Sequence, residues 1–302
     1  MLFADRLAAA VRDRGTPILL GLDPHLDLLP EEFAIARDLD APRSERADAV
    51  ATFCEQLVDV AADRVPAVKP QSAFFEQLGA DGVAAFERVV AHARAAGLLV
   101  VGDVKRGDIA STAAAYARAH LAPDGTGAAG RCDAITINPY LGADSLEPFV
   151  EVADAAEGGL FVLVRTSNPG GTAWQAAGQP SFAESVADQW AAWGAERAAA
   201  TESGLSNLGA VVGATHPSEL AVWRARMPHA WMLLPGFGAQ GATAADVAGA
   251  FRDDGLGALI ASSRGIAFAY RAEGADPDWK QAASAAVDAM VADLRAAVPQ
   301  AG

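Results

Sequence analysis

The sequence predicts a (β/α)8 barrel that occupies the whole chain, residues 1–302, as a single domain. Three observations support this prediction. Eight short apolar runs recur along the chain, alanine-rich stretches with helical periodicity lie between them, and polar or glycine-containing clusters follow most of the runs. Eight alternating β and α segments in about 250 residues or more are typical of a closed parallel barrel covered by helices.

Each expected strand is an apolar run that ends in glycine, proline or a polar side chain, as strands buried on both faces do. The runs are residues 18–23, 65–69, 98–105, 134–138, 160–167, 208–214, 230–235 and 258–263. Periodicity does not distinguish a closed barrel from an open, doubly wound sheet, which therefore remains an alternative. The polar clusters at the C-terminal ends of the runs favour the barrel, because barrel enzymes build their active sites at that end.

The expected helices lie between these runs and show charged faces with helical spacing. They span residues 47–62, 82–96, 112–120, 182–200, 217–226, 243–251 and 279–297. Pro217 suits the first turn of its helix, where a missing N–H has no cost. By composition, residues 121–130 and 168–180 are expected to be loops within the domain.

Composition and charge exclude several classes of protein. The chain has 23 Lys and Arg against 38 Asp and Glu, a net charge of −15, whereas nucleic-acid binders depend on Lys and Arg contacts to phosphate. Hydrophobic residues make up 52% of the chain, which indicates a globular protein with a large core. We expect neither a membrane span nor a signal peptide, and we expect the protein to be cytoplasmic. Cys54 and Cys132 lack metal or disulfide spacing and are expected to be reduced and buried.

The segment GDVKRGDIAST, residues 102–112, follows the third run and concentrates charge. Asp103 and Lys105 are two residues apart, so on a strand both side chains point to the same side, at the barrel mouth. Asp108 lies just beyond, in the next loop. A solvated charge run at a turn is the competing interpretation. Two further strands also end in ionisable residues, Asp23 and Lys69, and this coincidence favours a site.

Each of these two residues also has a simpler interpretation. Asp23 precedes a proline and suits a turn or a helix cap, and Lys69 is long enough to extend its ammonium group from an apolar strand into water.

Residues 236–241, GFGAQG, match the letters of the dinucleotide motif GxGxxG. We reject that interpretation, because the acidic residue expected about twenty positions later is replaced by a glycine-rich stretch. A phosphate site fits better, since barrel enzymes often bind phosphate with the loops after strands seven and eight. Gln240 supplies an amide donor, and Ser263 and Arg264 lie in the SSRG segment after the eighth run. A plain surface charge is the alternative for Arg264.

The remaining candidate residues are less specific. The five histidines, His25, His92, His120, His216 and His229, show no metal-ligand spacing, so the sequence supports no metal site. Ser167, in RTSNPGG, is a candidate hydrogen-bonding residue for a ligand or an ordinary turn residue. His216 ends the sixth run, where a capping or packing role is at least as well supported as a place in the barrel mouth.

Taken together, these motifs resemble the orotidine 5′-monophosphate decarboxylase family. GLDP, VKPQSAFFE, DVKRGDIAST, RTSNPGG, PGFGAQG and SSRG occur in the family's order and span most of the chain, and VKPQ and ATHP are similar to a branch found in many bacteria. The resemblance implies a homodimeric (β/α)8 barrel that uses no metal and no cofactor. Its implied reaction is the conversion of orotidylate to uridylate in pyrimidine nucleotide synthesis.

The resemblance also implies individual roles. Lys105 is the implied proton donor, Asp103 lies beside the substrate carboxylate, and Lys69 belongs to the same charged array. Asp108 and Thr112 reach into the neighbouring subunit's site, so the active sites are shared. The implied substrate-binding residues are Asp23 at the ribose, Ser167 near the pyrimidine, Gln240 and Arg264 at the phosphate, and Ser263 in the same loop.

The chemistry is consistent with these roles. Loss of CO2 leaves an electron pair on a ring carbon without an adjacent carbonyl, so the enzyme must stabilise or quench a carbanion. An ammonium group flanked by carboxylates is suited to this, because opposite charges favour its protonated form. Repulsion between Asp103 and the substrate carboxylate at ~4 Å contributes only about 4 kcal/mol at an effective dielectric of ~20. Most of the catalysis must come from transition-state electrostatics and from phosphate binding energy.

Two other functions remain open at this point. A metal-dependent sugar-phosphate decarboxylase or aldolase would use the carboxylates to hold a divalent ion. A non-catalytic barrel would bind a nucleotide without turnover, although the intact set of Lys and Asp residues argues against it.

Overall fold

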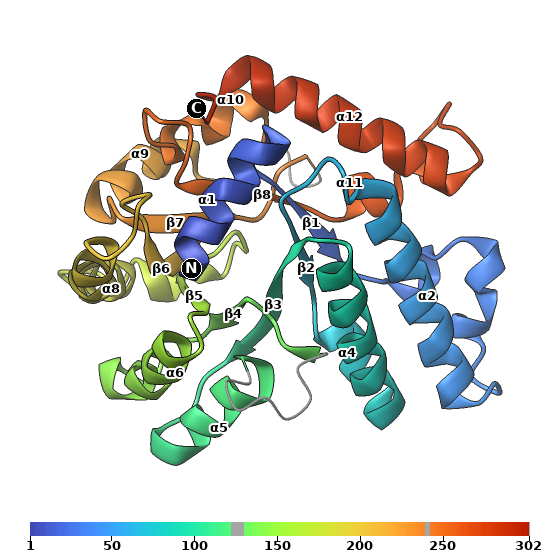
Figure 1. Cartoon of the computed structure of the whole chain (residues 1–302), viewed down its shortest axis with the longest axis horizontal. Coiled ribbons are helices and arrows are strands. Elements are labelled where there is room, and N and C mark those ends of the chain that lie inside the picture. Colours follow the sequence, from blue (N-terminus) through green and yellow to red (C-terminus); the bar gives the residue numbers. More distant parts are fainter. Residues whose placement is uncertain (122–129, 239–241, 302) are drawn as a thin grey trace.

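A computed structural model of the chain shows eight parallel strands that close into a barrel in chain order (Figure 1). The structure describes residues 1–121, 130–238 and 242–301. The strands are β1 (Ile18–Leu22), β2 (Ala67–Pro70), β3 (Leu99–Arg106), β4 (Ala134–Ile137), β5 (Gly159–Arg165), β6 (Ser206–Val212), β7 (Ala230–Leu234) and β8 (Ala258–Ser262). The barrel and all eight expected strands are confirmed, and pairing of β1 with β8 excludes the open sheet.

Helices surround the barrel (Figure 1). The longer ones are α1 (Phe3–Arg14), α2 (Arg43–Ala61), α4 (Gly79–Ala95), α5 (Ala110–Leu121), α6 (Ala143–Ala155), α8 (Phe182–Ala198), α9 (Pro217–Arg226) and α12 (Trp279–Ala297). Short helices are η1 (Leu26–Leu28), η2 (Glu31–Arg37), α3 (Ala73–Glu76), α7 (Gly171–Gln175), α10 (Ala244–Val247), η4 (Ala248–Ala250), α11 (Arg264–Ala267) and η5 (Ala269–Arg271). Within the described part of the chain, no helix is both long and apolar enough to cross a membrane.

The starts of several helices follow from local sequence. Ser181 and Glu184 form a reciprocal capping box at the start of α8, and the Asp278 carboxylate accepts backbone N–H bonds at the start of α12. Pro217 occupies the first turn of α9, as predicted. The expected helix over residues 243–251 is broken into α10 and η4, and α1 and α6 were not predicted.

The interpretation of residues 168–180 as a loop was wrong in part, because the structure contains α7 there. Glycine and proline in this segment give little local preference for a helix. Tertiary contacts stabilise it instead: the Gln175 side chain bonds Thr166, and the Thr172 hydroxyl accepts a bond from Arg165.

Alternate residues of each strand point into the barrel and form two layers. The lower layer is apolar and consists of Leu19, Ala67, Val101, Ala134, Phe161, Gly209, Trp231 and Leu259. Two residues further along each strand lies the mouth layer: Gly21, Lys69, Asp103, Thr136, Leu163, Val211, Leu233 and Ala261. The charged side chains therefore stand directly above a hydrophobic floor.

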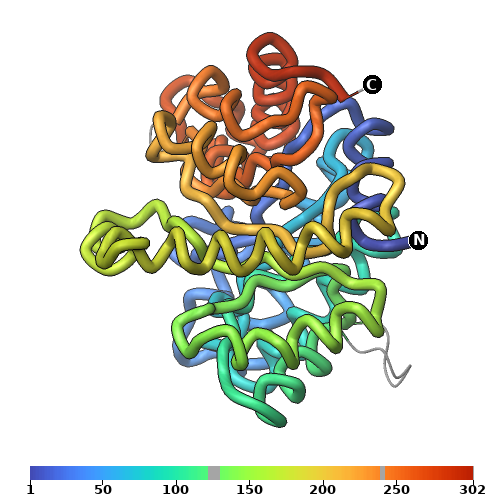
Figure 2. Tube along the Cα trace, turned by 90° about the vertical axis from the view of Figure 1, so that its left-hand side faces the viewer, coloured from blue at the N-terminus to red at the C-terminus, as the bar shows by residue number. Residues whose placement is uncertain are grey.

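Helix α1 closes the lower end of the barrel. Its apolar face packs against the lower layer, where the rings of Phe3 and Phe161 lie edge to face with centroids 6.1 Å apart. The backbone N–H of Ala4 donates to the Asn207 side chain over 2.9 Å. Figure 1 shows α1 across the ring of strands, and Figure 2 shows the N-terminus and the segment after β5 on opposite sides of the molecule. The mouth is thus left as the open end.

Candidate active site

Lys69, Asp103 and Lys105 form a row of alternating charge at the mouth, which we call the charged row. Lys69 Nζ donates to Asp103 Oδ2 over 2.7 Å, and Lys105 Nζ donates to Asp103 Oδ1 over 2.6 Å. Two uncharged groups complete the carboxylate's shell: Gln71 Nε2 donates to Oδ2 and Thr136 Oγ1 to Oδ1, each over 2.9 Å. Both carboxylate oxygens therefore receive two donors, which hold Asp103 in one orientation.

Asp103 and Lys69 are kept ionised although both are buried. Burial alone would raise the pKa of Asp103, but the charges of Lys69 and Lys105 outweigh it and hold that pKa well below its usual range. Burial likewise opposes the charged form of Lys69, and the carboxylates of Asp103 and Asp23 raise its pKa overall. Lys69 is only 7% exposed, so its ammonium group does not extend into water.

Lys105 differs from its neighbours in exposure and backbone conformation. Its side chain is 45% exposed, which leaves the ammonium group accessible from the cavity above. Its φ of +43° lies in the left-handed region that residues with a side chain rarely adopt. The ladder between β3 and β4 shifts register between Gly102 and Arg106, which surrounds this residue.

A cavity of about 360 Å³ opens over the charged row, and we call it the larger cavity. Apolar side chains of β5, β6 and β7 form one wall, and Ser167 from the segment after β5 lies at its edge. The lining residues are Lys69, Asp103, Lys105, Thr136, Leu163, Thr166, Ser167, Asn168, Val211, Leu233 and Pro235. A mostly apolar pocket with a few convergent charges is typical of a small-molecule site.

A smaller cavity of about 120 Å³ adjoins it, and Lys69 and Pro235 line both. The smaller cavity contains Asp23, Ser263 and Arg264, from the ends of β1 and β8. Among the described residues, Asp23 Oδ1 and Ser263 Oγ are buried there without a hydrogen-bond partner, which is expected of groups that await a ligand. Gln240, the other predicted phosphate ligand, lies outside the described residues.

Gly21 brings the loop after β8 close to β1. A Cβ on Gly21 would lie 2.6 Å from the Ser263 Cβ, so a larger residue would displace the segment that carries Ser263 and Arg264.

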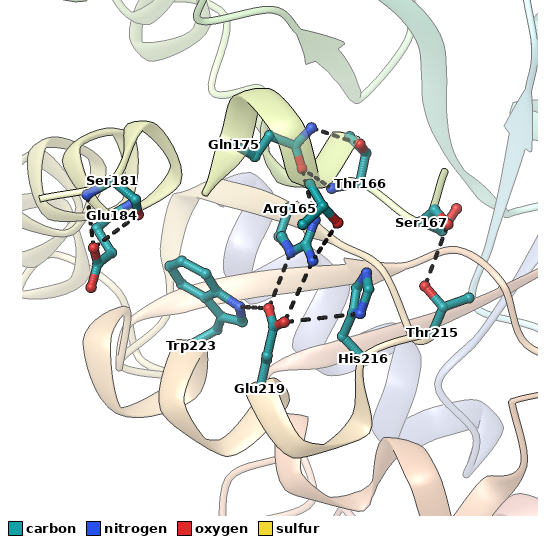
Figure 3. A network of polar contacts seen from close by, with 11 residues as sticks. Arg165, Thr166, Ser167, Gln175, Ser181, Glu184, Thr215, His216, Glu219 and Trp223 are labelled. Carbon is teal, nitrogen blue, oxygen red and sulfur yellow. Dashed lines mark hydrogen bonds and ion pairs between the residues drawn. The ribbon is translucent and has the colours of Figure 1, made fainter. Parts of the chain in front are cut away.

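Behind Ser167, an ion pair between buried Arg165 and partly exposed Glu219 supports the end of β5 (Figure 3). Arg165 Nε donates to Glu219 Oε2 over 3.1 Å, and the same guanidinium reaches the Thr172 hydroxyl of α7. Burial would raise the pKa of Glu219, but the bond from Arg165 leaves that pKa lowered. His216 Nδ1 lies 3.9 Å from Glu219 Oε1 (Figure 3), and His216 is not among the residues that line the two cavities.

The same support holds the backbone just before Ser167. The N–H of Thr166 donates to Gln175 Oε1 over 2.9 Å, and Gln175 Nε2 donates to the Thr166 hydroxyl over 2.7 Å (Figure 3). The Ser167 backbone carbonyl accepts a bond from Thr215 over 3.5 Å. Ser167 is therefore held at the edge of the larger cavity by contacts from α7 and from the end of β6.

Asp108 and Thr112 do not join the charged row. Asp108 Oδ1 accepts the N–H of Ile109, and Thr112 is exposed in the first turns of α5. Within the described part of the chain, no ion pair or hydrogen bond connects Asp108 with Lys105. This separation leaves their predicted role across a subunit interface as a prediction.

Three residues that support the site were not predicted: Gln71, Thr136 and Arg165. Two signals were available for the first two residues: Gln71 lies two residues beyond Lys69, and Thr136 is the polar residue of the otherwise apolar stretch AITI. A further signal is the scarcity of lysine. The chain contains three lysines, Lys69, Lys105 and Lys280, and two of them lie in the charged row.

The Asp103 carboxylate is poorly suited to bind a metal, because two ammonium groups and two neutral donors occupy it. Within residues 1–121, 130–238 and 242–301, no group of three or more His, Cys, Asp or Glu side chains is arranged to hold an ion. Independence from a metal and a cofactor stays a prediction.

Comparison with known proteins connects this geometry to a family. The model of the orotidine 5′-phosphate decarboxylase / HUMPS family matches residues 17–275. A curated orotidine 5′-phosphate decarboxylase from Rhodopirellula baltica is 44% identical and covers 98% of this chain and 99% of its own length. The one from Deinococcus radiodurans is 43% identical, over 88% of this chain and 89% of its own.

Solved structures agree. OMP decarboxylase from Leishmania donovani superposes with a TM-score of 0.74 at 34% identity, covering 98% of both chains. A crystal structure from Streptomyces avermitilis gives a TM-score of 0.80 at 40% identity over 98% of this chain and 96% of that one. With its closed barrel, its charged row and these relatives, the chain belongs to the orotidine 5′-phosphate decarboxylase / HUMPS family.

Proposed function

We propose that this protein decarboxylates orotidine 5′-monophosphate to uridine 5′-monophosphate, a step of pyrimidine synthesis, with Lys105 as the proton donor. The observation that carries the proposal is the charged row that lines the larger cavity, next to a smaller cavity whose polar groups have no partner among the described residues. Anchoring and reacting groups thus lie side by side.

The two cavities suggest how the nucleotide lies. The phosphate binds at the ends of β7 and β8, where Arg264 supplies a guanidinium and Ser263 a hydroxyl. Gln240, outside the described residues, stays a predicted amide donor to it. The unpartnered Asp23 oxygen accepts a bond from a ribose hydroxyl. The pyrimidine then occupies the larger cavity, between its apolar wall and the charged row, with Ser167 beside the ring.

In this orientation the reaction needs one bond cleavage and one proton transfer. The bond between the ring carbon and the carboxylate breaks, CO2 leaves, and the electron pair stays on the ring carbon. Lys105 Nζ delivers a proton to that carbon and becomes a neutral amine, which regains a proton from water. The proton donor stands ready because Asp103 holds the ammonium group over 2.6 Å.

Asp103 and Lys69 prepare this step. Four donors hold the Asp103 carboxylate, so it cannot rotate away from the substrate's carboxylate. As CO2 leaves, the negative charge moves from the carboxylate beside Asp103 to the ring carbon, and the relieved repulsion favours the transition state by about 4 kcal/mol. Lys69 balances the charge of Asp103 when the substrate has left.

We propose further that two copies form a homodimer with shared sites, in which Asp108 and Thr112 complete the partner's charged row. In its own subunit Asp108 makes no bond to Lys105, and Thr112 is exposed. Exposed apolar side chains lie on the same segment, Ile109 at 55% and Tyr116 at 38%, and burying them would stabilise a dimer.

We place the enzyme in the cytoplasm, where buried, free Cys54 and Cys132 remain reduced.

The activity is tested by following the pyrimidine absorbance of orotidine 5′-monophosphate mixed with the purified protein. We expect turnover both with and without EDTA. Loss of turnover in EDTA that a divalent ion restores would identify the metal-dependent alternative. Binding of the nucleotide without turnover would identify a non-catalytic barrel.

Shared sites are tested by mixing Lys105→Ala with Asp108→Ala, each inactive alone. After subunit exchange, half of the sites in a heterodimer carry both changes and the others carry neither, so activity should reappear. The control mixes Lys105→Ala with Lys69→Ala: both residues belong to one chain's charged row, so every site of that heterodimer keeps one change and the mixture should stay inactive. If mass measurement verifies exchange and the first mixture stays inactive, Asp108 serves its own barrel.

A further inference from the structure

Thr136, on β4, makes two hydrogen bonds that connect the Asp103 carboxylate with the backbone of Lys105. Its hydroxyl donates to Asp103 Oδ1 and accepts the backbone N–H of Lys105, each over 2.9 Å. Thr136 is 1% exposed, so water cannot replace either bond easily. A hydroxyl has one proton to donate and lone pairs to accept, and here both functions are used.

The backbone of Lys105 needs this bond. The β3–β4 ladder shifts register between Gly102 and Arg106, and the N–H of Lys105 bonds a side-chain oxygen where a regular ladder would offer a carbonyl. Lys105 also has a φ of +43°, a conformation that persists only where the surroundings stabilise it. An unpaired N–H at this place would favour a return to an ordinary strand conformation.

We propose that Thr136 is a positioning residue for the proton donor: its hydroxyl holds the left-handed backbone of Lys105 and so aims Nζ into the larger cavity. The contacts form a closed ring, from Lys105 N to Thr136 Oγ1, to Asp103 Oδ1, and back through the 2.6 Å bond to Lys105 Nζ. Both ends of the lysine are thereby fixed to one carboxylate. This inference rests on the proposed function of Lys105.

The Thr136 hydroxyl should affect the rate of the reaction and not the affinity for the nucleotide. Thr136 is absent from the lining of the smaller cavity, where the phosphate and ribose groups are proposed to bind. Loss of its hydroxyl should therefore slow proton transfer and leave the affinity for the nucleotide nearly unchanged, because binding energy comes from the other cavity. A residue that only fills space would not produce this difference between kcat and KM.

The test compares Thr136→Val, which keeps the shape and removes the hydroxyl, with Thr136→Ser, which keeps the hydroxyl. On orotidine 5′-monophosphate, the Val variant should lose about 10- to 100-fold in kcat with KM changed by no more than about threefold. The Ser variant should stay within about threefold of the unaltered enzyme in both constants. Thermal melting establishes that each variant is folded at the assay temperature, and Thr136→Ala replaces the Val variant if that one does not fold.

Two outcomes overturn the inference. A folded Val or Ala variant with unchanged kcat would show that the hydroxyl is dispensable, and a Ser variant as slow as Val would show that packing matters instead. Neither outcome concerns the proposed function, which fails separately if the unaltered protein does not turn over the nucleotide or if Lys105→Ala keeps full activity.

Discussion

The lower layer and the mouth layer of the barrel lie on the same eight strands, two residues apart, and have opposite properties. The lower layer is apolar and sealed by α1, with Phe161 and Trp231 fully buried. The mouth layer carries the charged row and opens into two cavities. One repeat of the strand pleat, about 7 Å, thus separates stabilising residues from reacting ones.

The mouth layer can hold buried charges because they are paired. Asp103 and Lys69 are each less than 10% exposed, yet each charge has an opposite charge within 2.7 Å. The hydrophobic floor excludes water from below, which strengthens these interactions and makes an unpaired member costly. The floor therefore supports the electrostatics of the row above it.

The largest expected effect is the loss of kcat when the lysine at the barrel mouth is removed. Lys105→Ala should lower kcat by about 10³- to 10⁴-fold, because it removes the proton donor. The melting temperature should change little, since the side chain is 45% exposed. Lys280→Ala, the change of a lysine on α12 away from both cavities, is the matched control and should leave kcat unaltered. An active Lys105→Ala enzyme would mean that the mouth layer has no catalytic lysine at this position.

A change in the lower layer should affect stability and not catalysis. Phe161→Ala should reduce the free energy of unfolding by about 3 to 5 kcal/mol, because it leaves a cavity in the lower layer next to Phe3. Denaturant unfolding measures this loss, and kcat of the folded fraction should stay close to that of the unaltered enzyme. A variant that keeps its stability and loses kcat would contradict the division of roles between the layers.

A third variant tests the division within the mouth itself. Arg264→Ala should reduce kcat/KM by about 10- to 100-fold, because a charged hydrogen bond to the phosphate is lost and its binding energy also serves the reacting centre. Steady-state kinetics measure this change, with exposed Arg271→Ala as the control. Unchanged kinetics for Arg264→Ala would place the phosphate elsewhere.

The smallest expected effect concerns pH and lies outside both layers. Burial, together with the charge of Arg106, lowers the pKa of His120 on α5 to about 4. Below pH ~6.5 the unfolded chain binds a proton there that the folded protein does not, so stability should fall from pH ~6.5 to about 4 by about 1 to 2 kcal/mol. Denaturant unfolding at several pH values checks this, and His120→Gln should flatten the dependence. An equally steep dependence in that variant would assign it to other groups.

Most of the fold could be predicted, because apolar runs and helical periodicity are local properties. All eight strands are where the pattern placed them, and α2, α4, α5, α8, α9 and α12 match expected helices. Helix α7 could not be predicted, because its stability depends on contacts with Arg165 and Thr166, which local propensity does not describe. The division of residues 243–251 into α10 and η4 was also missed.

The candidate site shows the same limit. The spacing of Asp103 and Lys105 predicted that both point to one side, and in the structure Lys105 Nζ donates to Asp103 Oδ1 over 2.6 Å. Gln71 and Thr136 were missed: the sequence shows that each is a polar residue in or after an apolar run, but not that both bond to Asp103. The predicted roles of Asp108 and Thr112 depend on a second subunit and stay predictions.

The sequence by itself determined which residues share a face of each strand, because side chains alternate with a period of two whatever surrounds them. It thereby placed Asp103 and Lys105 on one side of their strand, and Lys69 at the C-terminal end of another. Only the tertiary structure decided that they meet on one carboxylate, because that depends on the register between β2, β3 and β4. Register is set by the closure of the whole barrel, and so are the register shift at Lys105 and the hydroxyl that holds it.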